Sequence, residues 1–365
     1  MKKQYKIIAL IVLAATAVAL LTGCRPPNTV SSGTPYKLAM LMNVYPYEKA
    51  ENGEYDLNAA ATRALSDASV SGCAWAALKD HAKTTSDSDR TGDDKTEAVK
   101  YYVPSLALTL KNDNKSYGDK FTSAAQQQLK TAVETNKAAT VVITSDEFAG
   151  AYAKVKDEKK YKDASFVIVT NPASDLLKDG AINSKTTAVV LQTEQHGYLF
   201  GYYAAEKGFK NIGYFGAEGS ASVAFVTGLK KGAEAGGASV VDFCTSSGPN
   251  ETVIKEDLEA NIPGTVDLLI GDELTMQYVA ASGKKYASIC KDEKAEFSVT
   301  INGEVLTAKL KEAVSGARLI SNPKTVWITA ADGLFVYSGS AELVTVPEFS
   351  TPAAAASADT TSETT

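Results

Sequence analysis

Polar residues follow several short apolar segments of this 365-residue chain, and their side chains suit the recognition of a polar ligand. Carboxylates and amides bind hydroxyl and amino groups through hydrogen bonds, which are stronger where one partner is charged. A helix N-cap or a solvated loop explains any single one of these acidic residues equally well. Their recurrence after successive apolar segments favours a shared ligand site. The candidates are Asn43, Asp146, Asn171, Asp272 and Asp292, together with residues 216–222.

Residues that carry out catalysis or hold metals are scarce in the sequence. It has two histidines, His81 and His196, which we expect on the surface or in packing roles, and no two cysteines lie at metal-ligand spacing. It shows no nucleophile with a recognisable base, and no phosphate-binding or dinucleotide-binding glycine motif. We therefore expect a protein that is not an enzyme and needs no metal or cofactor. Acid pairs at 146–147 and 272–273 leave an exported enzyme as a third alternative, but helix starts explain them more simply.

The elements that would position the candidates alternate between strand and helix. Short apolar or β-branched runs predict strands, and the stretches between them have helical length and composition. Continuous apolar strands separated by helices indicate an α/β protein with parallel sheets covered on both faces. In such sheets a ligand lies beyond the carboxyl ends of the strands, where helix N-termini also point. The expected strands are residues 37–42, 105–110, 140–144, 165–170, 187–191, 211–215, 239–243, 266–270 and 286–289, and the expected helices include 118–136, 148–161, 222–235, 251–260 and 273–282.

The folded region is too long for one ordinary core, so we expect two lobes that face each other across a cleft. The first lobe would comprise residues 36–192 and 296–346, and the second would comprise residues 193–295. The chain would cross between them at residues 191–194 and again at 290–296.

The last part of the folded region departs from the alternating pattern. Residues 296–306, EFSVTINGEVL, predict a hairpin that turns at Asn302-Gly303. A helix over residues 307–314 and strands at 324–329 and 334–336 would follow, and we expect this segment to return to the first lobe.

The first 24 residues, MKKQYKIIALIVLAATAVALLTGC, have the form of a secretory signal peptide. Three lysines precede a fifteen-residue apolar run, which is too short and wrongly flanked for an ordinary spanning helix. The ending LTGC fits the bacterial lipoprotein cleavage pattern, with an ordinary signal or a single anchor helix as the alternative. We expect residues 1–23 to be removed and Cys24 to carry lipid such as palmitate, which anchors the protein to the cell membrane on its extracellular or periplasmic side.

Both ends of the mature chain have the composition of unstructured polypeptide. Residues 24–35 form a Pro/Ser/Thr tether, and residues 347–365 have the composition of a disordered tail. Removing residues 1–23 takes away three lysines and no acidic residue, so the net charge falls from −6 to −9. An acidic chain with scattered lysines is a poor candidate for binding nucleic acid.

The stretch EQHGYLFGYYAAEKGFKNIGYFGAEGSASVAFVTGLKKGAEAGG, residues 194–237, carries the most specific pattern. It reads as a helix, a strand, a glycine turn and a second helix packed closely on the sheet through Gly228 and Gly232. It resembles the basic membrane protein family of bacterial lipoproteins, which includes the purine nucleoside receptors of ABC transporters. The residues that carry the resemblance are Glu194, residues 197–201, Ile212, Gly213, Gly216, Phe225, Gly228, Gly232 and Ala233.

The resemblance extends to DASVSGCAWAAL, residues 67–78, where the family has Asp-x-Ser-Phe-Asn at a helix start. Asp67 and Ser69 would then contact the ligand, while Val70 stands where a phenylalanine would stack on a base. Residues 43–67 exceed the family's usual loop. A helix through residue 65 would place Asp67 inside or after that helix instead of at a helix mouth, and we favour the alignment on Asp67.

The resemblance implies a type I periplasmic-binding-protein-like fold and assigns roles to further residues. Phe225 would stack on the base from the second lobe, and Asp272 and Asp292 would accept hydrogen bonds from the ribose or the base. Because the first-lobe phenylalanine is missing, Tyr45, Tyr47 or Phe148 would replace it, or the ligand would not be a purine nucleoside.

The leading hypothesis is a solute-binding lipoprotein that closes its lobes on a small polar ligand, most simply a nucleoside, and delivers it to an ABC permease. The alternative is a surface sensor or interaction lipoprotein on the same scaffold, with an altered or degenerate pocket. The missing stacking residue and the residues inserted before Asp67 favour that alternative.

Overall fold

The computed structural model describes residues 37–44, 57–66, 69–84, 99–104, 117–217, 219–246, 251–338 and 343–349. The chain divides into two units, Met1–Thr34 and Pro35–Thr365, and every described residue belongs to the second unit. The expected signal peptide, Cys24, Asp67 and the expected strand at 105–110 lie outside the described residues.

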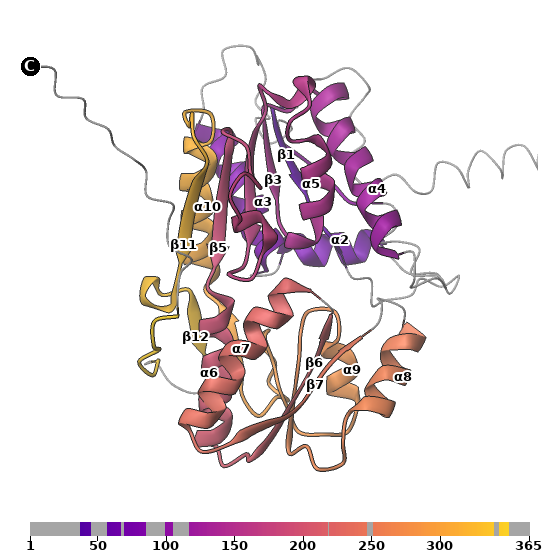
Figure 1. The fold of residues 1–365 in the computed structure, drawn as a ribbon, viewed down its shortest axis with the longest axis vertical. Helices are drawn as coiled ribbons and strands as arrows, with labels where there is room; N and C mark the ends of the chain where they lie inside the picture. The colour runs from indigo at the N-terminus through magenta and orange to yellow at the C-terminus, as the bar shows by residue number, and fades with distance from the viewer. Residues whose placement is uncertain are drawn as a thin grey trace, which may run out of the picture. The chain divides into compact units, whose positions relative to one another are not determined.

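A parallel sheet with the strand order β11-β5-β4-β3-β1-β2 forms the first lobe (Figure 1). Its central strands are mostly apolar and buried along their whole length, as the sequence predicts for a sheet covered on both faces. Strand β2 was not expected from the sequence. Strand β11 comes from the last part of the chain and pairs with β5, beginning with Lys324 beside Thr187. The strands are β1 (Leu38–Leu41), β2 (Val99–Tyr102), β3 (Thr140–Ile143), β4 (Ser165–Thr170), β5 (Thr186–Leu191) and β11 (Lys324–Ile328).

Helices cover both faces of the first sheet. Alternate residues of the strands divide between two apolar clusters, so Met40 packs on one face and Leu41 on the other. The first face is covered by α3 (Val70–Thr84) and α10 (Gly303–Gly316), with α2 (Leu57–Ser66) beside α3. The second face is covered by α4 (Tyr117–Lys130), which continues as a π-helical turn (Thr131–Thr135), and by α5 (Ala149–Val155).

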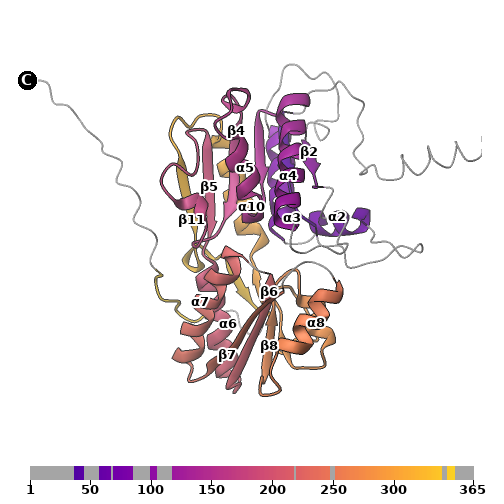
Figure 2. The same ribbon diagram turned by 45° about the vertical axis from the view of Figure 1, so that its right-hand side comes forward.

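The second lobe contains a parallel sheet with the strand order β7-β6-β8-β9. Figure 2 shows this sheet between α6 and α7 on one side and α8 on the other. Phe215 and Leu269 pack under α8 and α9, whereas Tyr214 and Ile270 pack on the α7 side. The strands are β6 (Asn211–Ala217), β7 (Ser239–Ser246), β8 (Leu268–Gly271) and β9 (Tyr286–Ala287), and the helices are α6 (Thr193–Glu206), α7 (Ser220–Ala235), α8 (Glu251–Asn261) and α9 (Met276–Ala281).

Glycines let α6 and α7 pack with their backbones in contact. A Cβ at Gly228 would lie 1.7 Å from the carbonyl oxygen of Glu194, and a Cβ at Gly197 would lie 1.8 Å from that of Phe225. Gly201 and Gly232 are equally enclosed by the opposite helix. The sequence correctly singled out Gly228 and Gly232, but they pack on helix α6 and not on the sheet. Only glycine tolerates such close approach.

The expected hairpin at residues 296–306 is wrong. Strand β10 (Val299–Ile301) pairs antiparallel with β12 (Phe335–Tyr337), and α10 begins directly after it. Asn302 caps that helix, because its Oδ1 accepts hydrogen bonds from the backbone N–H groups of Glu304 and Val305. Asn-Gly thus marks a helix start here, and the partner strand comes from 34 residues further along the chain, as the pairing of Ile301 with Phe335 shows.

Three connections link the two large sheets to each other or to the small sheet of β10 and β12. Gln192 joins β5 to α6, residues 288–298 join β9 to β10, and residues 329–334 join β11 to β12. The last of these contains a short 3-10 turn, Ala330–Asp332. One apolar cluster contains residues of both sheets, including Met40 and Ile270. The chain is therefore an α/β protein with two lobes, and its domain boundaries remain a prediction.

The chain beyond β12 packs on the second lobe. Phe349 is only 6% exposed, although it belongs to the segment predicted to be a disordered tail. Its ring lies against Tyr198, with centroids 6.2 Å apart, and Lys231 Nζ lies 4.5 Å from its centroid. The backbone N–H of Val344 donates to Tyr203 Oη at 3.0 Å. Ordered packing thus continues at least as far as Phe349.

Candidate ligand site

The turn after β3 presents Asp146 at the carboxyl edge of the first sheet. Ser145 adopts an extended conformation, and its Oγ accepts a hydrogen bond from the Glu147 N–H. This cap starts a 3-10 turn, Asp146–Phe148, that leads into α5. The sequence predicted Asp146 as a site residue from this position after a strand.

Three hydroxyl groups donate hydrogen bonds to the Asp146 carboxylate. Thr170 Oγ1, at the end of β4, donates to Oδ1 at 2.7 Å, and Ser174 Oγ donates to the same oxygen. Ser220 Oγ donates to Oδ2 at 2.6 Å. Thr170 and Ser174 are buried and belong to the first lobe, whereas Ser220 is the first residue of α7 in the second lobe.

Asn171 completes a contact between the two lobes. Its Nδ2 donates to Ser220 Oγ at 2.8 Å, and its Oδ1 accepts from the Ala173 N–H at 3.0 Å. The Ser220 hydroxyl therefore donates to a carboxylate and accepts from an amide, and both partners come from the opposite lobe. Asn171 is only 4% exposed and Ser220 is half-buried, so this hydrogen bond is partly shielded from water.

The end of β1 adds further polar groups to the same edge. Asn43 Nδ2 donates to Glu147 Oε2 at 2.6 Å, and Asn43 Oδ1 accepts from the Val44 N–H. Ser71, in the first turn of α3, donates to Thr144 Oγ1 at 3.2 Å. Because β1 and β3 are adjacent and parallel, their polar ends gather at one edge.

Gln192 carries a buried oxygen without a hydrogen-bond partner in the described part of the chain. The residue is 1% exposed and follows β5 directly, yet its Oε1 finds no donor there. In-register pairing places Val190 of β5 beside Thr170 of β4, so Gln192 lies at the edge that holds Thr170 and Asn171. Such an orphaned acceptor costs about 1–3 kcal/mol.

Asp272 has a structural role in its own loop. Its Oδ2 accepts from the Ala217 N–H at 2.5 Å, and its Oδ1 accepts from the N–H groups of Leu274 and Thr275 and from Thr275 Oγ1. Burial raises the pKa of this carboxyl above its ordinary value, against the lowering effect of these hydrogen bonds. All these donors belong to the second lobe, so the carboxylate fixes the loops that follow β6 and β8.

Asp292 also has a partner within the second lobe. Its Oδ2 accepts from Tyr286 Oη at 2.8 Å, and its Oδ1 accepts from the Lys294 N–H at 2.9 Å. Burial, followed by the hydrogen bond and charge of Asp292, raises the pKa of Tyr286 to about 12. Asp292 remains half-buried, so a ligand contact through it stays a prediction.

Two aromatic candidates are core residues, which corrects the sequence-based expectation. Phe148 is fully buried and stacks on Phe121, with centroids 5.3 Å apart. Phe225 is 5% exposed and packs against Phe200 and Tyr214 at 5.4 and 5.3 Å. Since neighbouring side chains cover both rings, neither presents a face on which a base could stack.

The predicted first-lobe motif is resolved only in part. Asp67 lies outside the described residues, between the end of α2 and the start of α3. Ser69 caps α3, because its Oγ accepts from the Gly72 N–H at 3.0 Å, and it donates to the Ala64 carbonyl at 2.8 Å. Ser69 thus joins two helices. Helix α2 exists and ends before Asp67, the arrangement that the sequence left open.

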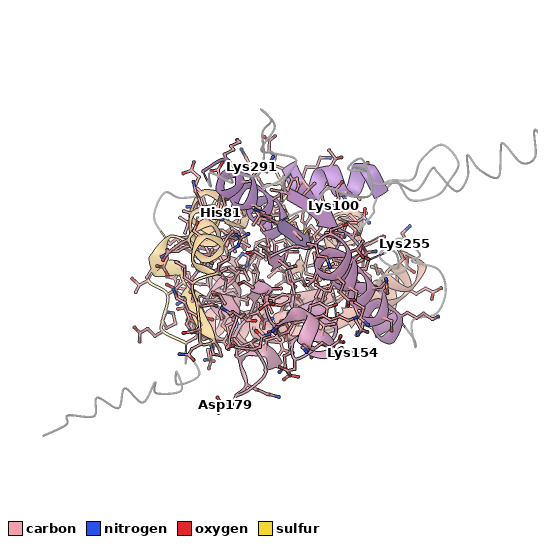
Figure 3. The ribbon with its side chains drawn as sticks, turned by 90° about the horizontal axis from the view of Figure 1, so that it is seen from above. His81, Lys100, Lys154, Asp179, Lys255 and Lys291 are labelled. Atoms are coloured by element: carbon pink, nitrogen blue, oxygen red, sulfur yellow. The ribbon has the colours of Figure 1, made fainter. Side chains whose placement is uncertain are left out.

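Four of the labelled charged side chains lie apart from one another at the edge of the protein (Figure 3). In Figure 3, Lys154 of α5, Lys255 of α8, Asp179 and Lys291 lie around the periphery, and all four are exposed. The described residues contain no group of three or more acidic, His or Cys side chains placed to hold a metal ion. None of the described helices is long and apolar enough to cross a membrane.

Thr170, Ser174 and Gln192 were not named as site residues from the sequence. Thr170 ends the apolar strand SFVIVT, and Gln192 follows TTAVVL, so a polar residue at the end of a buried strand is the available signal. Ser220 falls within residues 216–222, which the sequence placed at the site. Its pairing with Asp146 depends on how the lobes meet, and no local pattern shows that.

The chain is similar in fold to solved structures, at low sequence identity. A solute-binding protein of an ABC transporter system from Aeropyrum pernix K1 is 13% identical, covers 83% of this chain and 76% of its own, and has a TM-score of 0.50. A transcription-regulator-like protein from Staphylococcus haemolyticus is 8% identical, with coverages of 83% and 97% and a TM-score of 0.50. A probable maltose operon transcriptional repressor from Staphylococcus is 10% identical, with coverages of 84% and 97% and a TM-score of 0.52.

These similarities show the fold, which is the type I periplasmic-binding-protein-like fold expected from the sequence. These three structures are of a solute-binding protein and of transcription regulators, not of enzymes. No protein-family model matches the chain. No curated protein matches it either.

Proposed function

We propose that this chain binds a small polar solute where the carboxyl edges of its two sheets meet. The observation that carries the proposal is the hydrogen-bonded group of Asp146, Asn171 and Ser220, which joins the end of β3 and β4 to the start of α7. In open α/β sheets a ligand binds at this position. Residues of both lobes meet at this edge, so a ligand bound there would change how the two lobes are held together.

The cellular role that we propose is delivery of the solute to an ABC permease by a lipid-anchored protein. Solute-binding proteins and transcription regulators share the fold, so the choice between them depends on the N-terminal sequence. Three lysines, an apolar run and LTGC at Cys24 support export and lipid attachment. Mass spectrometry of the membrane-associated protein tests whether Cys24 carries lipid. An N-terminus without lipid on Cys24 would contradict it.

A nucleoside is the ligand class that we propose, on the basis of the resemblance in residues 194–237. Base stacking would have to come from residues other than Phe148 and Phe225, since both belong to the core. Tyr45 and Tyr47 follow β1 in the sequence and are the remaining candidates; they lie outside the described residues.

The test is to identify the molecule that purifies with the protein by its mass after denaturation. A thermal-shift screen of nucleosides, sugars and amino acids complements it, because a ligand that binds only the folded state at 100 times its Kd adds about 2.7 kcal/mol of stability. Absence of a shift with every nucleoside at millimolar concentration would exclude the nucleoside assignment.

The second candidate function is a surface sensor or interaction lipoprotein with an altered pocket. Specific observations favour it: Asp272 is satisfied by its own loop, and Phe225 is covered by neighbouring rings. The two candidates differ in outcome. A carrier binds a solute reversibly, so its Tm rises with that solute in the thermal-shift screen. A sensor or interaction protein with an altered pocket shows no rise in Tm with any class of solute in the screen.

A further inference from the structure

The Ser220 hydroxyl is held by the opposite lobe in the way that proteins hold a ligand hydroxyl. A hydroxyl can donate one hydrogen bond and accept others, and full recognition uses both capacities. Asp146 Oδ2 accepts the Ser220 proton at 2.6 Å, and Asn171 Nδ2 donates to the same oxygen at 2.8 Å. A carboxylate and an amide on one lobe thus form a complete binding pair for one hydroxyl group.

We infer that Ser220 occupies the place of a ligand hydroxyl, so that a hydroxyl-bearing solute and Ser220 compete for the pair formed by Asp146 and Asn171. This inference rests on the proposed function and narrows it to ligands with free hydroxyl groups, such as a ribose moiety or a cyclic polyol. Without solute, the hydrogen bonds of Ser220 hold α7 against the first lobe. With solute, the ligand hydroxyl takes over Asp146 and Asn171, and Ser220 is released.

The surroundings of Asp146 support a displaceable partner. Its Oδ1 is occupied by Thr170 and Ser174, both buried and both on the same lobe as Asp146. Its Oδ2 is bonded only to Ser220 among the hydrogen bonds that the described residues make to this carboxylate. Oδ1 is therefore held by residues of its own lobe, whereas Oδ2 is held by Ser220 of the other lobe, which can move away from it.

Gln192 independently indicates that a hydrogen-bond donor binds at this edge. Its Oε1 is buried and finds no donor in the described part of the chain. The β4 and β5 pairing places it at the strand ends that also hold Thr170 and Asn171. Buried acceptors are rarely left unsatisfied, and one beside a ligand edge is explained if the ligand supplies the donor. A second hydroxyl of the same solute has that chemistry.

The decisive variant is Ser220→Ala, and Thr227→Ala is its matched control. Both residues belong to α7 and carry a hydroxyl, but Thr227 is exposed and donates only within its helix, to the Val223 carbonyl at 2.8 Å. Binding is measured by calorimetry with nucleosides and cyclic polyols as probes, and with free bases and 2′,3′-dideoxynucleosides as the analogues that lack these hydroxyls. We expect Ser220→Ala to bind the hydroxylated probes about ten-fold more tightly than the wild type, because the hydroxyl that competes with the ligand for the Asp146 carboxylate is removed. Thr227→Ala should match the wild type.

A ligand-free measurement separates the inference from the proposed function. Spin labels at the exposed positions Lys154 and Lys255, with native cysteines replaced, report the distance between α5 and α8. Ser220→Ala should add a population with a longer distance, and Thr227→Ala should not. If no probe binds any variant, the proposed function fails. If probes bind but Ser220→Ala leaves the distance and the affinity unchanged, only the inference fails.

Two further outcomes would overturn the inference. Weaker binding in Ser220→Ala would mean that Ser220 contacts the ligand instead of competing with it. Equal binding of the free bases and the dideoxy analogues would remove the requirement for a ligand hydroxyl. Gln192→Leu provides a readout of its own. It should raise the Tm of the ligand-free protein, because the buried acceptor without a partner is gone. It should also lower the affinity for the hydroxylated probes at least several-fold. A raised Tm with unchanged affinity would show that Gln192 does not meet the ligand.

Discussion

The Nε2 atom of His196 lies 2.7 Å from the carbonyl oxygen of Val299, which ties the first turn of α6 to strand β10. A carbonyl can only accept, so Nε2 carries the proton and the neutral ring is the tautomer protonated there. The ring also stacks on Phe335 of β12, with centroids 4.7 Å apart. One buried histidine thus joins the second lobe to both strands of the small sheet beside the lobe connections.

Acid should destabilise the protein through His196. Burial lowers its pKa to about 4, despite the raising effect of the Val299 hydrogen bond, while the unfolded value is 6.5. The unfolded chain therefore binds the proton first, so stability is complete above pH 6.5 and falls by up to about 3 kcal/mol as the pH drops to 4. Urea unfolding across this range measures the loss. His196→Gln, which keeps a donor but does not titrate in this range, should flatten the slope attributed to His196, and an unchanged slope would contradict the assignment.

Gly228→Ala should separate α6 from α7. The new methyl would lie 1.7 Å from the Glu194 carbonyl oxygen, a backbone atom that cannot move without shifting the helix. We expect a loss of about 3 kcal/mol or more in the free energy of unfolding, measured by chemical denaturation. Gly316→Ala, also a glycine within a helix but with nothing within 4 Å of the added atom, serves as the control and should be neutral or stabilising.

Phe225→Ala should destabilise the fold before it affects any ligand. The ring is 5% exposed and contacts Phe200 and Tyr214, so truncation leaves a cavity that costs about 3–5 kcal/mol. Phe225→Leu should lose less stability and should keep the affinity of the folded protein for its solute. If Phe225→Leu stays stable but loses affinity more than ten-fold, Phe225 is a stacking residue after all.

Truncation at the C-terminus should locate the end of the packed chain. Removing residues 350–365 should leave the Tm unchanged, since the sequence predicts a disordered tail there. Phe349→Ala should cost about 3 kcal/mol, because its ring packs on Tyr198 under Lys231. Differential scanning calorimetry on the two variants makes the comparison. Equal Tm values for both would show that Phe349 contributes nothing to stability.

Thiol counting should find three reactive cysteines in the denatured, unreduced mature protein. Strands β7, which contains Cys244, and β9, which precedes Cys290, lie at opposite edges of the second sheet with β6 and β8 between them. Two intervening strands mean a separation of about 14 Å, beyond the reach of a disulfide. Finding a single thiol would contradict the strand order. In the native protein Cys73 should react slowly, since burial raises the pKa of its thiol, whereas Cys290 is exposed.

The alternation of strand and helix was predictable because central strands such as TVVI and SFVIVT are apolar on both faces. Strand β2 was missed because VKYY is short and carries a lysine within it. The hairpin was wrong because Asn-Gly is a signal for a tight turn as well as for a helix cap, and only the distant partner β12 decides between them.

The site was only partly predictable, for a different reason. Position after a strand was enough to predict that Asp146 and Asn171 lie at one edge of the sheet, since the ends of parallel strands share that edge. Whether Phe225 faces a ligand or the core depends on how closely α7 approaches α6. That approach depends on the glycines at which the two helices touch. The pairing of Ser220 with Asp146 likewise depends on contact between lobes.

The order of the strands along the chain has a consequence for synthesis. The second sheet has all of its strands once residue 287 has been made, whereas the first sheet lacks its edge strand β11 until residue 328. Until then β5 presents an unpaired edge, although most of the first lobe precedes the second. The second lobe should therefore be able to fold while the earlier one waits, and a chain that stops before Lys324 would expose β5 to pairing with other chains.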